Sequence, residues 1–243
     1  MKYCFIVLLG LSTVALAQRP AWDFHDGFRG LFEGKVVTNA PYSGVGVTTS
    51  KRTLSDGNAI NEASCSKVYR DSSGRTRREE TRNSASCSAT PDTIQISDPV
   101  AGVRYAINIQ NKTYRQFTIK APASASGTTP QARTRPANPN EVRTSLPASL
   151  IAGTSFSAEN TQTVTTIPAG KLGNAQPIAI TSTRSYSPDL QIVISSTRTD
   201  PRSGVTTYQL SNISTAEPAE SLFQLPAGLT LEQGPSRRGR RAP

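Results

Sequence analysis

The chain has 243 residues with 27 basic and 17 acidic side chains, a formal net charge of +10, and a single histidine. This length fits one β domain or two small ones. One histidine and the two widely spaced cysteines Cys65 and Cys87 do not supply a zinc site, which needs about three or four clustered ligands. A Ser/His/Asp mechanism would have to use His25 alone. Composition therefore argues against a metalloenzyme, while the basic balance permits anionic partners without requiring them.

The first 17 residues have the organisation of a secretory signal peptide. Lys2 gives a positive start, and the apolar run Cys4–Val14 is shorter than the roughly 20 residues that cross a bilayer. Ala15-Leu16-Ala17 places small residues at the cleavage positions. We expect cleavage after Ala17 and an exported protein, periplasmic or secreted, without a transmembrane span. The alternative for this stretch is a buried N-terminal strand.

Residues 18–35 form an aromatic segment. Phe24, Phe28 and Phe32 recur on one face of a helix, and Asp23 and Gly34 are residues that begin and end helices. The sequence predicts one short helix here. Together with Trp22, these aromatic side chains would cover an open apolar face, either as a movable lid or as a helix packed permanently on a sheet.

Residues 36–229 read as consecutive antiparallel strands joined by hairpins. Apolar residues alternate with polar ones in two places, which are Val103, Tyr105, Ile107 and Ile109, and then Leu190, Ile192 and Ile194. Such alternation buries one face of a sheet and exposes the other. We therefore predict a mainly β fold, a single antiparallel curved sheet or half-barrel. A Pro/Ser/Thr-rich stretch at 121–148 predicts a long loop, and residues 230–243 predict a disordered basic tail.

One hairpin can be predicted in register. If Gly74 adopts the left-handed conformation of a three-residue turn, Asp71 pairs with Arg75. Lys67 then faces Glu79, a favourable cross-strand pair. A slip of one residue would place Lys67 opposite Arg78 instead, so charge favours the first register.

Cleavage would leave two cysteines, Cys65 and Cys87, in similar Ala-Ser-Cys-Ser settings. An even pair in an exported protein suggests a disulfide, and the alternative is two buried free thiols. Basic residues also cluster twice, around the hairpin at Gly74 and in the tail as Arg237, Arg238, Arg240 and Arg241. The tail arginines are candidate contacts for an anionic surface, and the alternative is a solvated charged face.

The known catalytic motifs are absent or incomplete. Ser64–Lys67 matches S-x-x-K, but the S-D-N and K-T-G elements do not follow and the stretch reads as a strand. Tyr42–Gly46 is too short to cradle a phosphate and reads as a bend or bulge. We therefore predict no enzyme, no cofactor and no metal ion.

Several segments resemble known exported proteins. Val68–Glu79, Ile96–Tyr105 and Tyr186–Gln191 resemble a family of uncharacterised exported bacterial proteins over most of residues 45–228. The ending Ser221–Pro226 is similar to that of periplasmic lipoprotein-carrier and lipoprotein-sorting proteins. That second resemblance implies a curved half-barrel around an apolar hollow with helices as a lid, although this chain offers only one candidate helix.

From these observations we expect a non-enzymatic envelope protein that binds an apolar or lipid-like ligand. The alternative is a structural or interaction protein that docks on anionic envelope surfaces through its arginines. No nucleic acid partner is expected.

Overall fold

The computed structural model describes residues 36–119 and 138–232, and within them twelve strands form one sheet. The strand order is β12-β6-β5-β4-β3-β2-β1-β11-β10-β9-β8-β7. A single 3₁₀ turn, η1 (Glu220–Phe223), is the helical element of these residues. The strands are β1 (Tyr42–Thr53), β2 (Ala59–Arg70), β3 (Thr76–Arg82), β4 (Thr93–Asp98), β5 (Val103–Asn108), β6 (Thr113–Thr118), β7 (Glu141–Leu150), β8 (Ser157–Ile167), β9 (Ile178–Ser187), β10 (Ile192–Asp200), β11 (Gly204–Ser214) and β12 (Thr230–Leu231).

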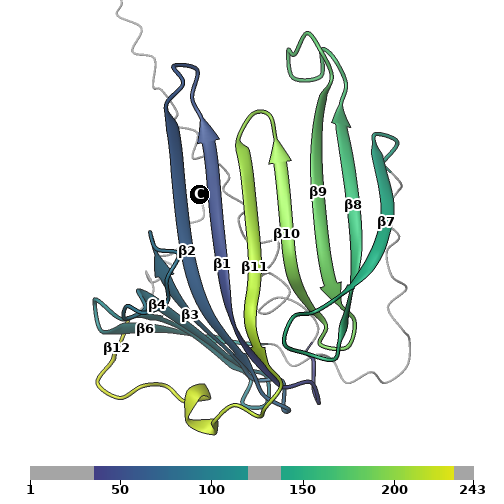
Figure 1. The fold of residues 1–243 in the computed structure, drawn as a ribbon. Coiled ribbons are helices and arrows are strands. Elements are labelled where there is room, and N and C mark those ends of the chain that lie inside the picture. The colour runs from purple at the N-terminus through teal and green to yellow at the C-terminus, as the bar shows by residue number, and fades with distance from the viewer. Residues whose placement is uncertain (1–35, 120–137, 233–243) are drawn as a thin grey trace, which may run out of the picture.

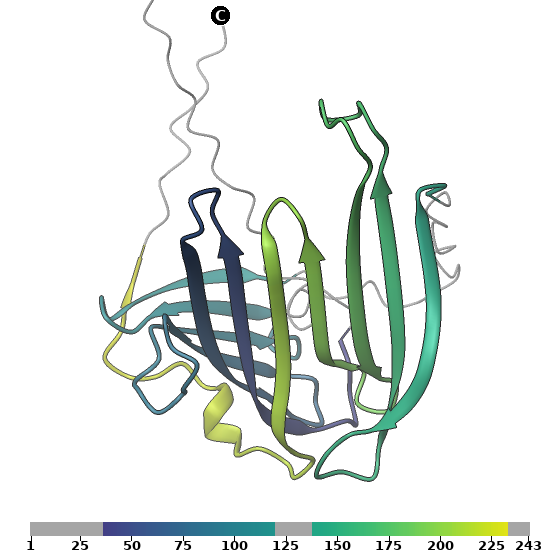
Figure 2. The same cartoon turned by 45° about the horizontal axis from the view of Figure 1, so that its top comes forward.

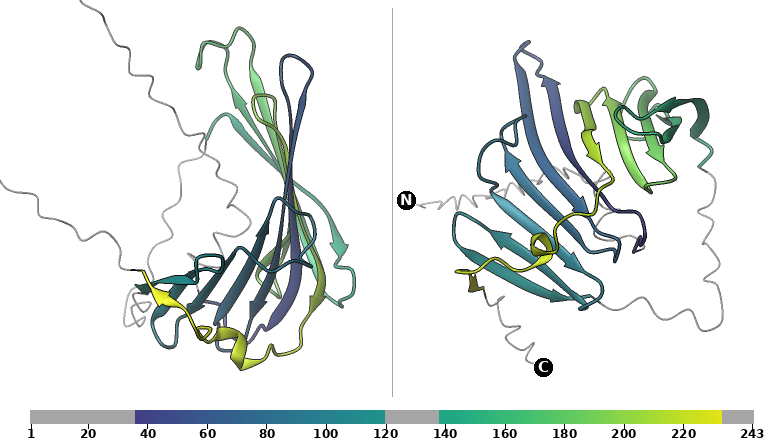
Figure 3. Two further views of the ribbon diagram at one scale, coloured as in Figure 1. Left: turned by 90° about the vertical axis from the view of Figure 1, so that its left-hand side faces the viewer. Right: turned by 60° about the horizontal axis from the view of Figure 1, so that its bottom comes forward.

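The sheet is open and strongly bent (Figure 1). The long strands β1 and β2 join a group that runs from β3 to β6 with a group that runs from β11 to β7, and the two groups point in different directions (Figure 3). Neighbouring strands are antiparallel except for β12, which pairs in parallel with β6. The predicted curved β-sheet is thus confirmed, as a mixed sheet. The predicted N-terminal helix lies outside the described residues.

Alternation of side chains gives the sheet two faces, which we name after one residue each. In the register of β1 and β2, Tyr42 lies opposite Arg70 and Val47 lies opposite Cys65. Successive residues of a strand point to opposite faces, so Tyr42, Val68 and Arg70 share the Tyr42 face. Cys65 and its cross-strand neighbours share the Cys65 face.

Each face carries one apolar cluster. The cluster on the Tyr42 face brings together buried residues of β1, β2, β8, β10 and β11 and of the turns beside them, namely Tyr42, Val68, Ile151, Ala158, Leu190, Ile192, Ile194, Tyr208, Leu210 and Ile213. The cluster on the Cys65 face consists of Ile94, Ile96 and Ile107, against which Tyr105, Ile109, Tyr114, Leu225 and Leu229 pack. Of the alternating residues, Ile107, Leu190, Ile192 and Ile194 are buried in the clusters and the half-buried Tyr105 and Ile109 pack against one of them, whereas Val103 belongs to neither cluster.

A C-terminal strap, Glu217–Glu232, covers the second cluster (Figure 2). Phe223 of η1 is buried, and the Nη1 of Arg77 donates a hydrogen bond to the carbonyl oxygen of Leu222 at 2.8 Å. Acidic residues fix both ends of the strap, because Glu217 accepts hydrogen bonds from Ser72 and Glu232 forms an ion pair with Arg115 at 2.8 Å. The described residues include no helix long and apolar enough to cross a membrane.

Two predicted boundaries are wrong. Residues 141–148 were expected to belong to the loop, but they form most of strand β7. Strand β7 lies at the edge of the sheet with all ten residues exposed, so its alternating Val142, Leu146 and Leu150 reach no core and pairing with β8 holds the strand. Its Pro147 sits where the register with β8 shifts, a position that does not need a backbone N–H. Likewise, Thr230 and Leu231 pair with β6 and do not belong to a disordered tail.

The predicted hairpin register is confirmed. Gly74 has a φ of 83°, and the backbone N–H of Asp71 donates to the carbonyl oxygen of Arg75 at 3.1 Å. Lys67 lies opposite Glu79. The carboxylate of Asp71 also accepts the backbone N–H of Arg75 at 2.8 Å, so a local side-chain contact reinforces the turn.

Tyr42 should make stability sensitive to high pH. Burial raises the pKa of Tyr42 to about 12, an effect that the guanidinium of Arg70 partly offsets. An unfolded tyrosine ionises near pH 10, so the stabilising contribution is complete below that value and is lost as the pH rises towards 12. We expect the free energy of unfolding to fall by roughly 2–3 kcal/mol over this interval.

Urea denaturation of wild type and Tyr42→Phe at a series of pH values checks this expectation. The fall in the free energy of unfolding with pH should be smaller in Tyr42→Phe than in wild type. Part of this pH dependence should remain in the variant, because burial also raises the pKa of Tyr208. Parallel curves for the two proteins between pH 10 and 12 would contradict the prediction.

Candidate functional site

A hollow of about 670 Å³ lies on the Cys65 face, where β1, β2 and β11 meet the segment between β3 and β4. Its floor consists of two rows of side chains across three strands. Thr49 lies opposite Ala63 on one side and Thr207 on the other, and Lys51 lies opposite Asn61 and Val205. Ser50 and Glu62 also line the hollow, but they lie between these rows and their side chains point to the Tyr42 face.

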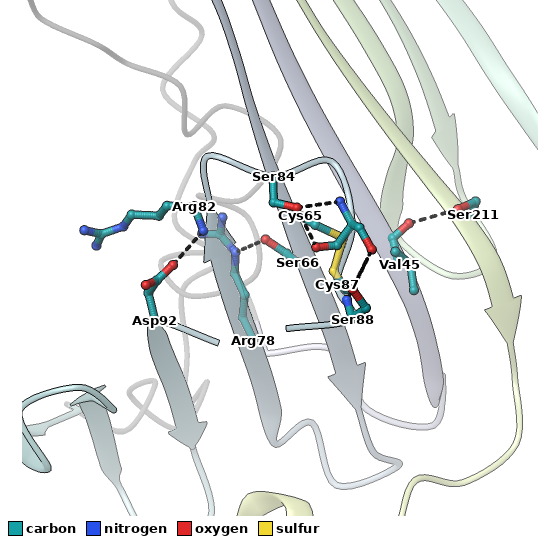
Figure 4. The surroundings of a disulfide bond; sticks show 11 residues. Val45, Cys65, Ser66, Arg78, Arg82, Ser84, Cys87, Ser88, Asp92 and Ser211 are labelled. Carbon is teal, nitrogen blue, oxygen red and sulfur yellow. Dashed lines mark hydrogen bonds between the residues drawn. A yellow bond between two sulfur atoms is a disulfide. The ribbon is translucent and has the colours of Figure 1, made fainter. Parts of the chain in front are cut away.

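A loop between β3 and β4, residues 83–92, forms one wall of the hollow through Asn83, Ser84 and Ala85. A disulfide between Cys87 of this loop and Cys65 of β2 holds the loop on the sheet, with a Cα–Cα distance of 5.3 Å (Figure 4). We call residues 83–92 the disulfide loop. The predicted disulfide is therefore present in the structure. Cys65 is fully buried, so the loop covers its own point of attachment.

Local hydrogen bonds fix the shape of the disulfide loop. The backbone N–H of Ser86 donates to Oγ of Ser84 at 3.0 Å, and the hydroxyls of Ser86 and Ser88 lie 3.0 Å apart (Figure 4). At the base of the loop, the carboxylate of Asp92 accepts the backbone N–H of Arg82 at 2.7 Å and the side-chain amide of Gln110 at 2.8 Å. Hydrogen bonds therefore hold the wall at its base and along its length, and the disulfide attaches it covalently to β2.

The hollow combines carbon-rich walls with a few polar groups. The hydroxyls of Thr49 and Thr207 lie 2.6 Å apart and form a hydrogen bond with each other across β1 and β11. Ala63, Ala85 and Val205 add further methyl groups. Lys51 carries the one ionised group that the floor presents, and Asn61 and Asn83 add amides. An apolar wall with a few placed polar groups is typical of a site that binds a small molecule.

The described residues show no catalytic arrangement. No group of three or more His, Cys, Asp or Glu residues among them could hold a metal ion. Two carboxylates are buried, Asp71 and Asp200, and they lie in hairpin turns at opposite ends of β1. Each has an arginine partner, and hydrogen bonds from Arg202 lower the pKa of Asp200. Such carboxylates do not converge on one reacting atom.

The geometry of strand β2 also excludes a catalytic role for the S-x-x-K match. Ser64 and Lys67 both lie on the extended strand β2, and they are three residues apart. Side chains with this separation on a strand point to opposite faces, so they cannot act together. His25 lies outside the described residues.

The arginines around the Gly74 hairpin have structural roles. Arg70 is buried, donates to the carbonyl oxygens of Ala40 and Leu190, and lies 4.8 Å from the ring of Tyr42. Arg75, Arg77 and Arg78 form ion pairs with Asp71, Glu79 and Glu80, and the last two arginines are buried. Of the five arginines in this cluster only Arg82 is exposed, so the hairpin forms neither a solvated basic face nor an anion-binding one.

The other predicted site residues stay predictions. The aromatic cover, Trp22, Phe24, Phe28 and Phe32, and the tail arginines, Arg237, Arg238, Arg240 and Arg241, lie outside the described residues. Conversely, sequence reasoning missed the hollow. In the sequence, Thr49 and Lys51 lie two residues apart on one strand, and Val205 and Thr207 lie two residues apart on another, so each pair shares a face. The two strands are separated by 158 positions, and no local pattern predicts that they pair.

No family model matches this sequence, and neither does any curated protein. Solved structures with a similar fold include MucB in the MucA/MucB complex of Pseudomonas aeruginosa, at 11% identity and a TM-score of 0.42. That match covers 81% of this chain and 59% of MucB, so this chain spans about three fifths of MucB. A LolA superfamily protein from Nitrosomonas europaea matches at 7% identity and a TM-score of 0.32, over 78% of this chain and 92% of its own.

A putative outer membrane lipoprotein-sorting protein domain from Vibrio parahaemolyticus matches at 7% identity and a TM-score of 0.29, over 76% of this chain and 89% of its own. Identities and scores at this level do not carry an activity from one protein to another, so the function is argued from the residues of the hollow.

Proposed function

We propose that the protein is a non-enzymatic binding module of the cell envelope and that the hollow on its Cys65 face binds an apolar or lipid-like ligand. The observation that carries the proposal is the composition of the hollow, in which Ala63 and Val205 together with the methyl-bearing side chains of Thr49 and Thr207 line the floor of a space of about 670 Å³. This volume lies within the range of small-molecule sites.

The envelope location is supported by two features of the chain. Residues 1–17 have the pattern of a signal peptide, and a disulfide joins Cys65 to Cys87. Disulfides persist in oxidising compartments such as the periplasm and are rare in the cytosol. An exported binding module is consistent with both features.

The energetics set the expected affinity. Each buried methylene contributes about 0.8 kcal/mol, so about ten of them contribute about 8 kcal/mol. That free energy corresponds to a micromolar dissociation constant before the cost of ordering the ligand is subtracted. We therefore expect binding in the micromolar range or weaker, which suits reversible capture and release.

Filling the hollow tests the proposal. Val205 is 36% exposed and lies on the floor of the hollow, so Val205→Trp should occupy the ligand's space and lower bound ligand at least tenfold. The matched control is Val100→Trp, since Val100 is 74% exposed in the turn between β4 and β5 and lies outside the hollow. Native mass spectrometry of each protein, purified from its own periplasm, followed by lipid extraction, gives the measurement. Equal ligand content in the two variants would show that the hollow is not the site.

The same preparation separates capture from docking on an anionic surface. Capture of an apolar chain should tolerate salt, whereas docking through exposed charges should weaken steeply as ionic strength rises. A protein without any co-purifying ligand, which binds anionic vesicles only while Arg237–Arg241 are present, would overturn the proposal in favour of docking.

A further inference from the structure

Lys51 places a positive charge at the floor of the hollow. It is exposed on β1 next to the apolar floor of the hollow, and it forms no ion pair with any described residue. Most of the arginines described above have a carboxylate or carbonyl partner, such as Arg77 with Glu79 and Arg115 with Glu232. A positive charge without a partner therefore stands beside a carbon-rich surface.

No acidic side chain of the floor neutralises this charge. Glu62 is the acidic residue that lines the hollow, and it pairs in register with Ser50, one position away from the Lys51 and Asn61 pair. Because of this offset, the carboxylate of Glu62 points to the Tyr42 face while the ammonium of Lys51 points to the Cys65 face. The polar groups that remain beside Lys51 are the amides of Asn61 and Asn83, which can donate hydrogen bonds.

The hollow is also limited in extent. Its floor spans three strands, which is about 10 Å across, and two rows of side chains, which lie about 7 Å apart. The disulfide loop closes one side. These dimensions suit one aliphatic chain that lies along the floor.

We propose that the hollow selects single-chain amphiphiles with an anionic head group, a class that includes fatty acids and alkyl phosphates. The chain lies on the methyl groups of the row Ala63–Thr49–Thr207, and the head group lies against the ammonium of Lys51, with the amide of Asn61 as a second donor. This inference rests on the proposed function, because it names the class of ligand that the same hollow takes.

The expected preference is modest. Lys51 is exposed, so water screens its charge, and an exposed ion pair contributes at most about a fivefold gain in affinity. An anionic head group should therefore bind about fivefold more tightly than a neutral one on the same chain. A cationic head group should bind more weakly than the neutral one because of repulsion by Lys51.

Calorimetric titration of the disulfide-intact mature protein with four ligands of one chain length tests the inference. The ligands are dodecanoate, dodecyl phosphate, dodecan-1-ol and dodecylammonium, each kept below its micelle concentration. Dodecanoate and dodecyl phosphate should bind about fivefold more tightly than dodecan-1-ol, and the stronger of the two identifies the head group as carboxylate or phosphate. Lys51→Met should remove the preference, so that dodecanoate, dodecyl phosphate and dodecan-1-ol bind to this variant with equal affinity. Lys171→Met, which removes an exposed lysine outside the hollow, should keep the preference.

Failure of the inference and failure of the proposed function give different results. Equal affinities for all four ligands, all abolished by Val205→Trp, would overturn the anionic selection and leave the hollow as the binding site. An equal loss of preference in Lys51→Met and Lys171→Met would also overturn it, because the overall positive charge would then explain the effect. If none of the four ligands binds, the proposed function itself is wrong.

Discussion

Replacing Gly204 with alanine is expected to destabilise the protein by about 2–5 kcal/mol. Gly204 begins β11 with a φ of 92°, and a Cβ at this position would lie 2.1 Å from the carbonyl oxygen of Lys51 and 2.9 Å from the Cα of Arg52. A positive φ costs a residue with a Cβ about 1–2 kcal/mol, and overpacking costs about 1–3 kcal/mol more. Both atoms in conflict belong to the backbone of β1, so relief requires moving that strand away from β11.

The chain offers a matched control in Gly153. Its φ is 78°, and an added Cβ would meet nothing within 4 Å. Gly153→Ala should therefore cost only the conformational strain of about 1–2 kcal/mol. Urea denaturation followed by far-UV circular dichroism measures both variants. Equal losses of stability would show that the close approach of β11 to β1 is not a constraint.

Gly204→Ala should also weaken ligand binding in protein that is still folded. The carbonyl oxygen in conflict belongs to Lys51, and Val205, the residue after Gly204, lines the floor of the hollow. Displacing β11 from β1 would separate Thr49 from Thr207 and open the floor between them. Dodecan-1-ol should then bind more weakly to Gly204→Ala than to Gly153→Ala.

The features that could be predicted from the sequence depend on short separations along the chain. The register of β2 and β3 follows from one turn, because Gly74 sets the conformation and Asp71 and Arg75 close it. The inward direction of Ile107, Ile192 and Ile194 follows from alternation within single strands. In both cases the information lies within about ten residues, where turn chemistry and period-two patterning act directly.

The features that could not be predicted depend on distant partners. Strand β7 lies at the edge of the sheet, where its alternating Val142, Leu146 and Leu150 stay exposed, and the proline and serines between them make the stretch resemble a loop. Arg70 becomes a core residue only because the carbonyl oxygen of Leu190, 120 positions away, accepts its guanidinium N–H. The hollow likewise exists only because β11 returns to pair with β1. Its residues carry no motif, since methyl groups of threonine and valine bind ligands only when several strands bring them together.

Removal of the disulfide should lower both stability and ligand binding. The Cys65–Cys87 bond closes 22 positions of sequence, and a loop of this size contributes about 3 kcal/mol on the chain-entropy view. For a domain of this size that loss corresponds to a fall in Tm of about 6–12 °C. The double variant Cys65→Ala/Cys87→Ala avoids leaving a polar hydroxyl at the fully buried position 65, so that it reports the loss of the cross-link.

Ligand binding reports an effect of the cross-link that is distinct from its effect on stability. Asn83, Ser84 and Ala85 form the loop wall of the hollow, and the disulfide is the covalent cross-link between this loop and β2. At a temperature where both proteins are folded, the double variant should bind dodecan-1-ol more weakly than wild type, and wild type treated with reductant should match it. Unchanged binding would show that the floor alone forms the site. Intact mass after alkylation provides the complementary check on the bond, because uptake of reagent by both cysteines of the mature protein before reduction would show that the bond does not form.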